Sequence, residues 1–149
     1  MSGPIPVLMA ERVLLGLGLP LGGMCIGGLS AGVGISAGLH EPGISVIGVL
    51  GTLLGIVAIS RLAPRIVPNA SRFSPTRRIT AGVAGFLAAR VVGRCLSLLG
   101  LDADALSHSG STWPIAQEGL FMLSTFGTML LTGGAALGRP NVANDSVSS

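Results

Sequence analysis

Four long apolar stretches, separated by short polar segments, limit what this chain can fold into more than any other feature. They cover about residues 13–39, 43–60, 79–101 and 119–138. A helix needs about 20 mostly apolar residues to cross the hydrocarbon of a bilayer, which is about 30 Å thick. Lipid offers a backbone no hydrogen-bond partners, so an isolated apolar segment of this length is stable there as a helix. We therefore predict an all-α integral membrane bundle of four transmembrane helices.

The composition supports a lipid environment and argues against a nucleic-acid-binding protein. Charged residues make up 10% of the chain, against about 25% in soluble proteins. The net charge of +3 could suggest nucleic acid, but the aromatic share of 3% is too small for base stacking. We expect the bilayer and other membrane subunits, or further copies of this chain, as partners, and no nucleic acid.

Polar segments divide the chain into its expected parts. His40 to Gly43 forms a short turn, and prolines interrupt the linker over 61–78. We predict one four-helix domain over 1–140, followed by a disordered polar tail over 141–149. The first apolar segment exceeds a simple span, so a kink or an interfacial first turn is expected near Pro20. A broken helix that lines a transport site is the alternative.

Arginine placement predicts the orientation. All nine basic residues are Arg, and loops on the cytoplasmic side of a membrane carry an excess of basic residues. Seven of the nine lie in the 61–78 linker or near the two termini, and none lies in the two opposite loops. We expect the linker and both termini in the cytoplasm of a bacterium, with the protein in the inner membrane.

Small residues recur at four-residue spacing and predict close helix packing. Residues four apart share one face of a helix, and small residues allow the close backbone approach that drives helix association in lipid. The first segment is richer in glycine than four internal helices need, which favours self-association or docking into a larger complex. The expected packing residues are Gly18, Gly22, Gly23, Gly27, Gly28, Gly32, Gly85, Ala89 and Gly93.

Arg90 and Arg94 are the residues whose placement in lipid is most costly. Each Arg at the centre of a span costs about 2.5–3.5 kcal/mol on insertion scales, and Arg90 lies at the midpoint of segment 79–101. Arg90 therefore needs a carboxylate, backbone carbonyls or a water-filled cavity. The candidate carboxylates are Glu118 and Glu11, and we favour a pair between Arg94 and Glu118.

The sequence contains no motif of a known reaction, so we expect neither an enzyme nor a metal or cofactor site. The first hypothesis is a non-catalytic scaffold or accessory subunit of a membrane complex, or a self-associating helical unit. The second is a small transporter or channel that uses Arg90 and Arg94 to bind an anion. The third is a holin-like pore former, which the size of the protein permits. The sequence does not identify a substrate, a partner or an oligomer number.

Overall fold

The computed structural model describes residues 4–99 and 113–139, and the side chains of 9–67, 69–99 and 119–139. The polar loop over 102–112 and the tail over 141–149 lie outside this range. The described residues form helices and no strands, and four helices contain segments long and apolar enough to cross a membrane. The expectation of an all-helical chain with four such helices is confirmed. The helices are α1 (Pro4–Ser36), α2 (Gly43–Ile66), α3 (Pro75–Leu98) and α5 (Trp113–Leu137), with a short 3₁₀ helix η1 (Pro68–Arg72) between α2 and α3.

Helix ends follow local sequence chemistry. At the end of α1, Gly38 has a φ of +78°, and the backbone N–H of Leu39 donates to the Gly34 carbonyl at 3.0 Å. This is a left-handed C-terminal cap, which glycine adopts without a steric penalty. At the start of α3, the Ser74 hydroxyl accepts from the Arg77 backbone N–H at 3.3 Å, and a proline occupies the first helical position.

Most helix boundaries differ from those predicted. Helix α1 covers Pro4–Ser36 instead of 13–39. Helix α2 continues beyond Ser60 to Ile66, helix α3 begins at Pro75 instead of Ile79, and helix α5 begins at Trp113 instead of Gly119. The prediction ended each segment where apolar residues ended, but helical hydrogen bonding continues into the polar residues beyond. Helix α1 also runs through Pro20 without interruption, so the broken helix considered for this segment is not found.

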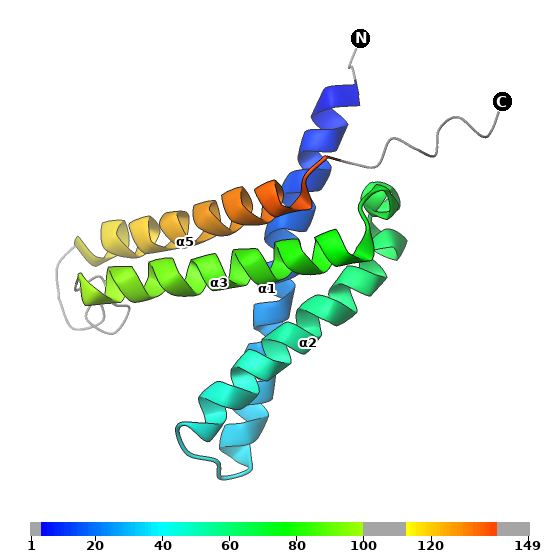
Figure 1. The fold of residues 1–149 in the computed structure, drawn as a ribbon. Coiled ribbons are helices and arrows are strands. Elements are labelled where there is room, and N and C mark those ends of the chain that lie inside the picture. The colour runs from blue at the N-terminus through cyan, green and yellow to red at the C-terminus, as the bar shows by residue number, and fades with distance from the viewer. Residues whose placement is uncertain (1–3, 100–112, 140–149) are drawn as a thin grey trace.

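The helices form two pairs that meet at one end and diverge at the other. Helix α1 lies along α2 and helix α3 lies along α5, and α1 also contacts both α3 and α5. The start of α1 and the end of α5 lie at the end where the pairs meet (Figure 1). From this end, the α1–α2 pair and the α3–α5 pair extend in different directions (Figure 1). We refer to the end where the pairs meet as the closed end, and to the opposite end, where they diverge, as the open end.

The closed end holds the main hydrophobic core. Phe73, which follows η1, is 1% exposed and lies in this core. Each of the four long helices contributes residues to this core. The linker between α2 and α3 also contributes, through Ala70 and Phe73. The buried core members are Leu15, Leu19, Ala63, Ala70, Phe73, Ala81 and Leu137.

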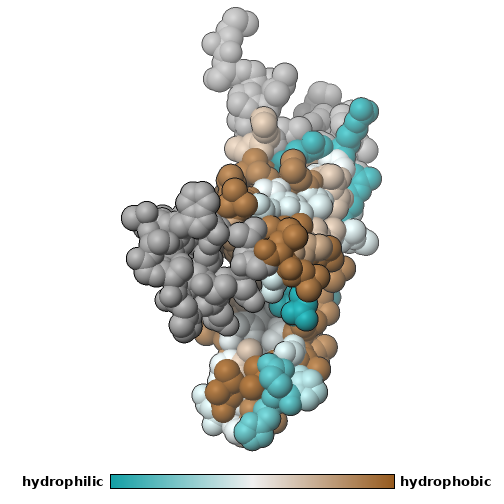
Figure 2. Space-filling model, turned by 90° about the vertical axis from the view of Figure 1, so that its left-hand side faces the viewer, coloured by the Kyte–Doolittle hydropathy of each residue, from teal (hydrophilic) through white to brown (hydrophobic). Residues whose placement is uncertain are grey.

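The outer faces of the helices remain apolar. Leu29 of α1 is 73% exposed, Leu54 of α2 is 69% exposed and Leu131 of α5 is 75% exposed. On the face seen in Figure 2, hydrophobic residues cover most of the middle of the coloured surface, and hydrophilic residues gather mainly towards its ends. Apolar side chains on the outside of all the main helices are typical of proteins surrounded by lipid.

Candidate functional site

The open end contains two cavities that meet at Arg90. One cavity of about 270 Å³ lies between α1, α2 and α3, and a second of about 790 Å³ lies between α3, α5 and Met24 of α1. Met24 and Arg90 line both cavities. We refer to the two cavities together as the wedge, because they occupy the space where the helix pairs diverge.

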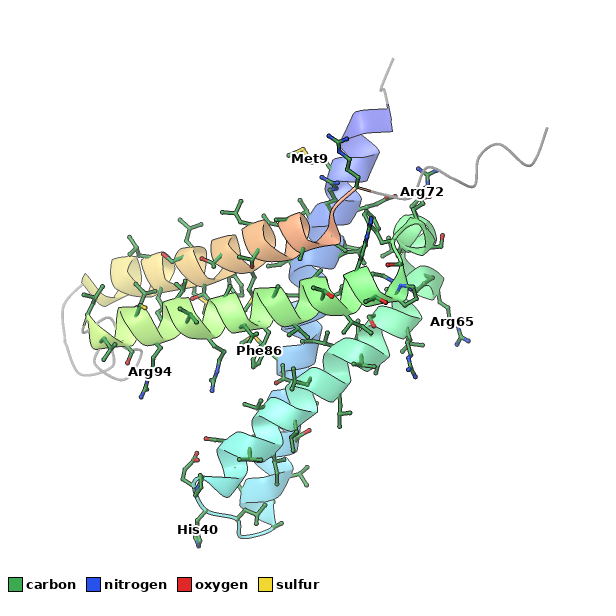
Figure 3. All side chains as sticks on the ribbon, in the orientation of Figure 1. Met9, His40, Arg65, Arg72, Phe86 and Arg94 are labelled. Atoms are coloured by element: carbon green, nitrogen blue, oxygen red, sulfur yellow. The ribbon has the colours of Figure 1, made fainter. Side chains whose placement is uncertain are left out.

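Arg90 and Arg94 lie on α3 one helical turn apart, and both are exposed. Arg94 lines the larger cavity, and its side chain extends from α3 to the side on which the α1–α2 pair lies (Figure 3). Because α3 ends at Leu98, the Cα of Arg94 lies about 6 Å and that of Arg90 about 12 Å from the helix end at 1.5 Å per residue.

The observed bounds of α3 correct the predicted depth of Arg90. A helix from Pro75 to Leu98 has 24 residues, or about 36 Å, so Arg90 lies about one third of the helix length from the open end and not at the midpoint. The difference arises because the Ser74 cap starts the helix four residues earlier than its apolar residues indicated. Both arginines are therefore closer to the end of their helix than the sequence implied.

The walls around the two guanidinium groups are small or apolar. Gly27, Gly28, Ala31 and Gly48 line the smaller cavity, and none has a side chain long enough to fill it. The larger cavity has apolar walls that include Leu87, Val91 and Phe121. Among the described residues that line the wedge, Arg90 and Arg94 are the only charged ones.

Of the two predicted carboxylate partners, the structure describes the side chain of Glu11 alone, and Glu11 does not line the wedge. The side chain of Glu118 lies outside the described residues, so the predicted Arg94–Glu118 pair stays a prediction. Glu11 lies at the closed end, where its Oε1 accepts a hydrogen bond from the side-chain amide of Asn69. The structure thus separates Glu11 from Arg90 and Arg94, although the sequence analysis named Glu11 as a candidate partner for them.

Two arginines, Arg12 and Arg77, bind the end of α5 to other helices at the closed end. Arg12 of α1 donates to the backbone carbonyl of Gly138, and Arg77 of α3 donates to the carbonyl of Arg139 at 2.5 Å. Both carbonyls directly follow α5, which ends at Leu137, and cationic side chains are favoured beside the C-terminus of a helix. These contacts hold the end of α5 against α1 and α3.

Two residues of this polar region were missed by the sequence analysis. The sequence analysis did not name Asn69 and counted Arg78 only among the charges of the 61–78 linker, but Arg78 is 4% exposed within α3. The Ser74-Pro75 pair is a helix-start signal that could have placed Arg78 in the first turn. Glu11 Oε2 and two nitrogens of Arg78 are buried and have no hydrogen-bond partner among the described residues.

The nine predicted packing residues have different surroundings. A Cβ added to Gly22, Gly23 or Gly27 would lie 1.9–2.5 Å from atoms of α2, and one on Gly85 would lie 3.0 Å from Pro20. Ala89 is 4% exposed, and a Cβ on Gly93 would be in ordinary contact with Phe121. A Cβ on Gly18, Gly28 or Gly32 would meet no atom within 4 Å.

The tightest approach between α1 and α5 was not predicted. A Cβ on Gly133 would lie 2.5 Å from the Gly16 carbonyl oxygen, and one on Gly16 would lie 2.9 Å from the backbone nitrogen of Gly134. Pro20 has no N–H to donate to the Gly16 carbonyl four residues earlier, so that oxygen lacks its helical partner. The missing side chain of Gly133 lets α5 approach this carbonyl. The Gly133-Gly134 pair was the signal in the sequence.

Comparison with known proteins yields no relative: no protein-family model, no curated protein and no solved structure is similar to this chain.

Proposed function

We propose that this chain is a non-catalytic multi-pass membrane protein that serves as a helical subunit of a larger assembly in the bacterial inner membrane. The observation that carries the proposal is a row of three exposed small residues on α1, which runs beside the exposed Leu29. Gly18, Cys25 and Gly32 lie seven residues apart, on one face of the helix. All three are exposed, and the two glycines have no neighbour within 4 Å of an added Cβ.

Such a face has a physical cost unless another helix covers it. Glycine within a helix is about 1 kcal/mol less favourable than alanine, and Gly18 and Gly32 obtain no contact within the chain in return. In lipid, helices associate through close backbone approach over small residues. The face therefore fits a second helix, from another copy of this chain or from another membrane subunit.

Mass measurement in a mild detergent or in nanodiscs tests this function. The wild-type protein is expected to form a defined oligomer or complex, and Gly18→Leu with Gly32→Leu is expected to dissociate it. Leu54→Phe, which adds bulk to an exposed position on α2, serves as the control and should leave assembly unchanged. A monodisperse wild-type monomer without partners would contradict the proposal.

Cys25 provides a second readout of the same face. It lies between the two glycines and is a free, exposed thiol. In a Cys95→Ser background, mild oxidation in membranes is expected to link copies through Cys25 if two copies of the chain pack over this face. Cross-linking through Cys95 alone, in a Cys25→Ser background, would place the contact elsewhere.

We further propose that the closed end faces the cytoplasm. Arg65 and Arg72 lie at this end (Figure 3), and the contacts described above place Arg12 and Arg77 there too. Because cytoplasmic loops carry an excess of basic residues, this clustering supports a cytoplasmic closed end. With both native cysteines replaced, His40→Cys should react with an impermeant maleimide on intact cells, and Arg72→Cys only after permeabilisation. The reverse pattern would overturn the orientation.

An anion transporter is a second candidate, because Arg90 and Arg94 both line the wedge. The core at the closed end argues against a continuous path through one copy, since Leu19 and Phe73 are each 1% exposed there. Transport would need these helices to separate. Anion flux into liposomes that is lost with Arg90→Leu would favour this function over a scaffold.

A further inference from the structure

The wedge combines two features, positive charge and apolar walls, that together indicate which kind of ligand it would bind. Arg90 and Arg94 bring two positive charges into a cavity of about 790 Å³. Besides the two arginines, the described walls of that cavity contain mostly apolar side chains, the hydroxyls of Ser97 and Thr125, and no carboxylate. A guanidinium group surrounded by lipid and apolar walls is costly unless an anion or water accompanies it. The cavity therefore suits a molecule with an anionic group next to an apolar body.

The positions of the two arginines along α3 indicate the level in the bilayer at which they would bind an anion. Helix α3 is about 36 Å long by its 24 residues, slightly more than the hydrocarbon thickness of about 30 Å. With α3 spanning the bilayer, its open end lies at the level of the lipid headgroups. Long arginine side chains extend towards that level from positions one to two turns inside it.

Arginine geometry favours phosphate as the group that is bound. The planar fork of a guanidinium donates two parallel hydrogen bonds to a phosphate, and two forks one turn apart can hold one phosphate group from two sides. Leu87, Val91 and Phe121 line the cavity beside them and offer a surface for an acyl chain. A free phosphate would leave these apolar walls uncovered, whereas a lipid covers both parts.

We propose that Arg90 and Arg94 bind the phosphate of an anionic phospholipid, whose acyl chain lies in the larger cavity of the wedge. The lipid belongs to the leaflet at the open end. It fills the space between the α3–α5 pair and α1, and it neutralises charges that would otherwise destabilise the spanning helix. The site rests on the membrane placement proposed above and not on the assembly through the α1 face.

Native mass spectrometry of the full chain, released from detergent with added lipids, tests the site. We expect about one tightly bound phosphatidylglycerol per chain, and weaker binding of phosphatidylcholine. Arg90→Gln with Arg94→Gln should weaken phosphatidylglycerol binding at least about tenfold, since charge-assisted hydrogen bonds are lost. Arg90→Lys with Arg94→Lys keeps both charges, and should restore only part of the affinity because the fork is lost.

The chain offers a matched control pair. Arg61 and Arg65 are also exposed and also one turn apart, on α2 near the closed end. Arg61→Gln with Arg65→Gln removes the same charge, and is expected to change phosphatidylglycerol affinity less than about twofold. Size-exclusion profiles and helical content measured on every variant identify those that have failed to fold.

Several outcomes would overturn the inference. If the Arg90/Arg94 and Arg61/Arg65 double variants lost phosphatidylglycerol affinity equally, the binding would reflect general attraction by positive charge. If phosphatidylglycerol and phosphatidylcholine bound equally well, the site would be an apolar groove without phosphate recognition. If inorganic phosphate bound in the absence of lipid, and this binding also needed Arg90 and Arg94, the ligand would be a free anion. A polypeptide retained in place of lipid would make the wedge a protein interface. A chain recovered in the soluble fraction without detergent would contradict the membrane placement itself, which the other outcomes leave standing.

Discussion

Gly27 and Gly28 are neighbours in α1 with opposite surroundings, and they allow the packing between α1 and α2 to be measured. A Cβ on Gly27 would lie 2.5 Å from the backbone carbonyl oxygen of Gly48 and 1.9 Å from Oγ1 of Thr52. The Thr52 hydroxyl could rotate, although it now donates to Gly48 at 2.8 Å. The Gly48 carbonyl belongs to the backbone, so only a shift of a whole helix could make room. A Cβ on Gly28 would meet no atom within 4 Å.

The expected magnitude follows from two opposing terms. Alanine is favoured over glycine within a helix by about 1 kcal/mol, and this term is the same at both positions. Overpacking a tight contact costs about 1–3 kcal/mol, and this term applies only to Gly27. We therefore expect Gly27→Ala to be less stable than Gly28→Ala by about 1–3 kcal/mol, because the shared term cancels in the comparison.

Unfolding in mixed micelles with increasing SDS, followed by circular dichroism, measures this difference. Dilute protein keeps the measurement on the packing within one chain. The Gly28→Ala protein should unfold at the wild-type SDS fraction or slightly above it, and Gly27→Ala clearly below it. If the two variants differ by less than about 0.5 kcal/mol, which is the range of ordinary surface substitutions, the close α1–α2 contact is refuted.

Two further predictions use the same measurement. Gly133→Ala should destabilise the protein by about 1–3 kcal/mol, because its Cβ would collide with the Gly16 carbonyl. Gly134→Ala is the control and should not destabilise it, because an added Cβ meets open space. Equal effects of the two substitutions would contradict the close approach of α1 and α5. Glu11→Gln keeps an acceptor for Asn69 and removes a buried charge, so stability should be unchanged or higher. Asn69→Ala leaves the buried Glu11 carboxylate without its donor and should lower stability by about 1–3 kcal/mol; an equally damaging Glu11→Gln would show that the charge itself is required.

The sequence predicted the glycine contacts only in part. Gly23, Gly27 and Gly32 belong to similar runs of small residues, but the first two meet α2 and the third meets nothing within the chain. A small residue permits close approach without specifying which helix approaches. The rotation of α1 against its neighbours decides this, and it depends on packing across the whole molecule.

The charged residues show the same limit. Their number and linear positions identified Arg90 and Arg94 as costly, but also made Glu11 a candidate partner for them. In the folded chain Glu11 meets Asn69 at the closed end, while Arg90 faces the wedge at the open end. Separation along the chain does not reveal this, since the η1 segment that supplies Asn69 is placed by the burial of Phe73.

The sequence by itself determined that the chain forms four long apolar helices, because segment length and composition alone decide which stretches can be helical in lipid. Tertiary structure decided where the helices part, which glycines touch a neighbour and what lies around the two arginines. These depend on how side chains of distant segments fit together, and a linear pattern of apolar and small residues is compatible with many such arrangements.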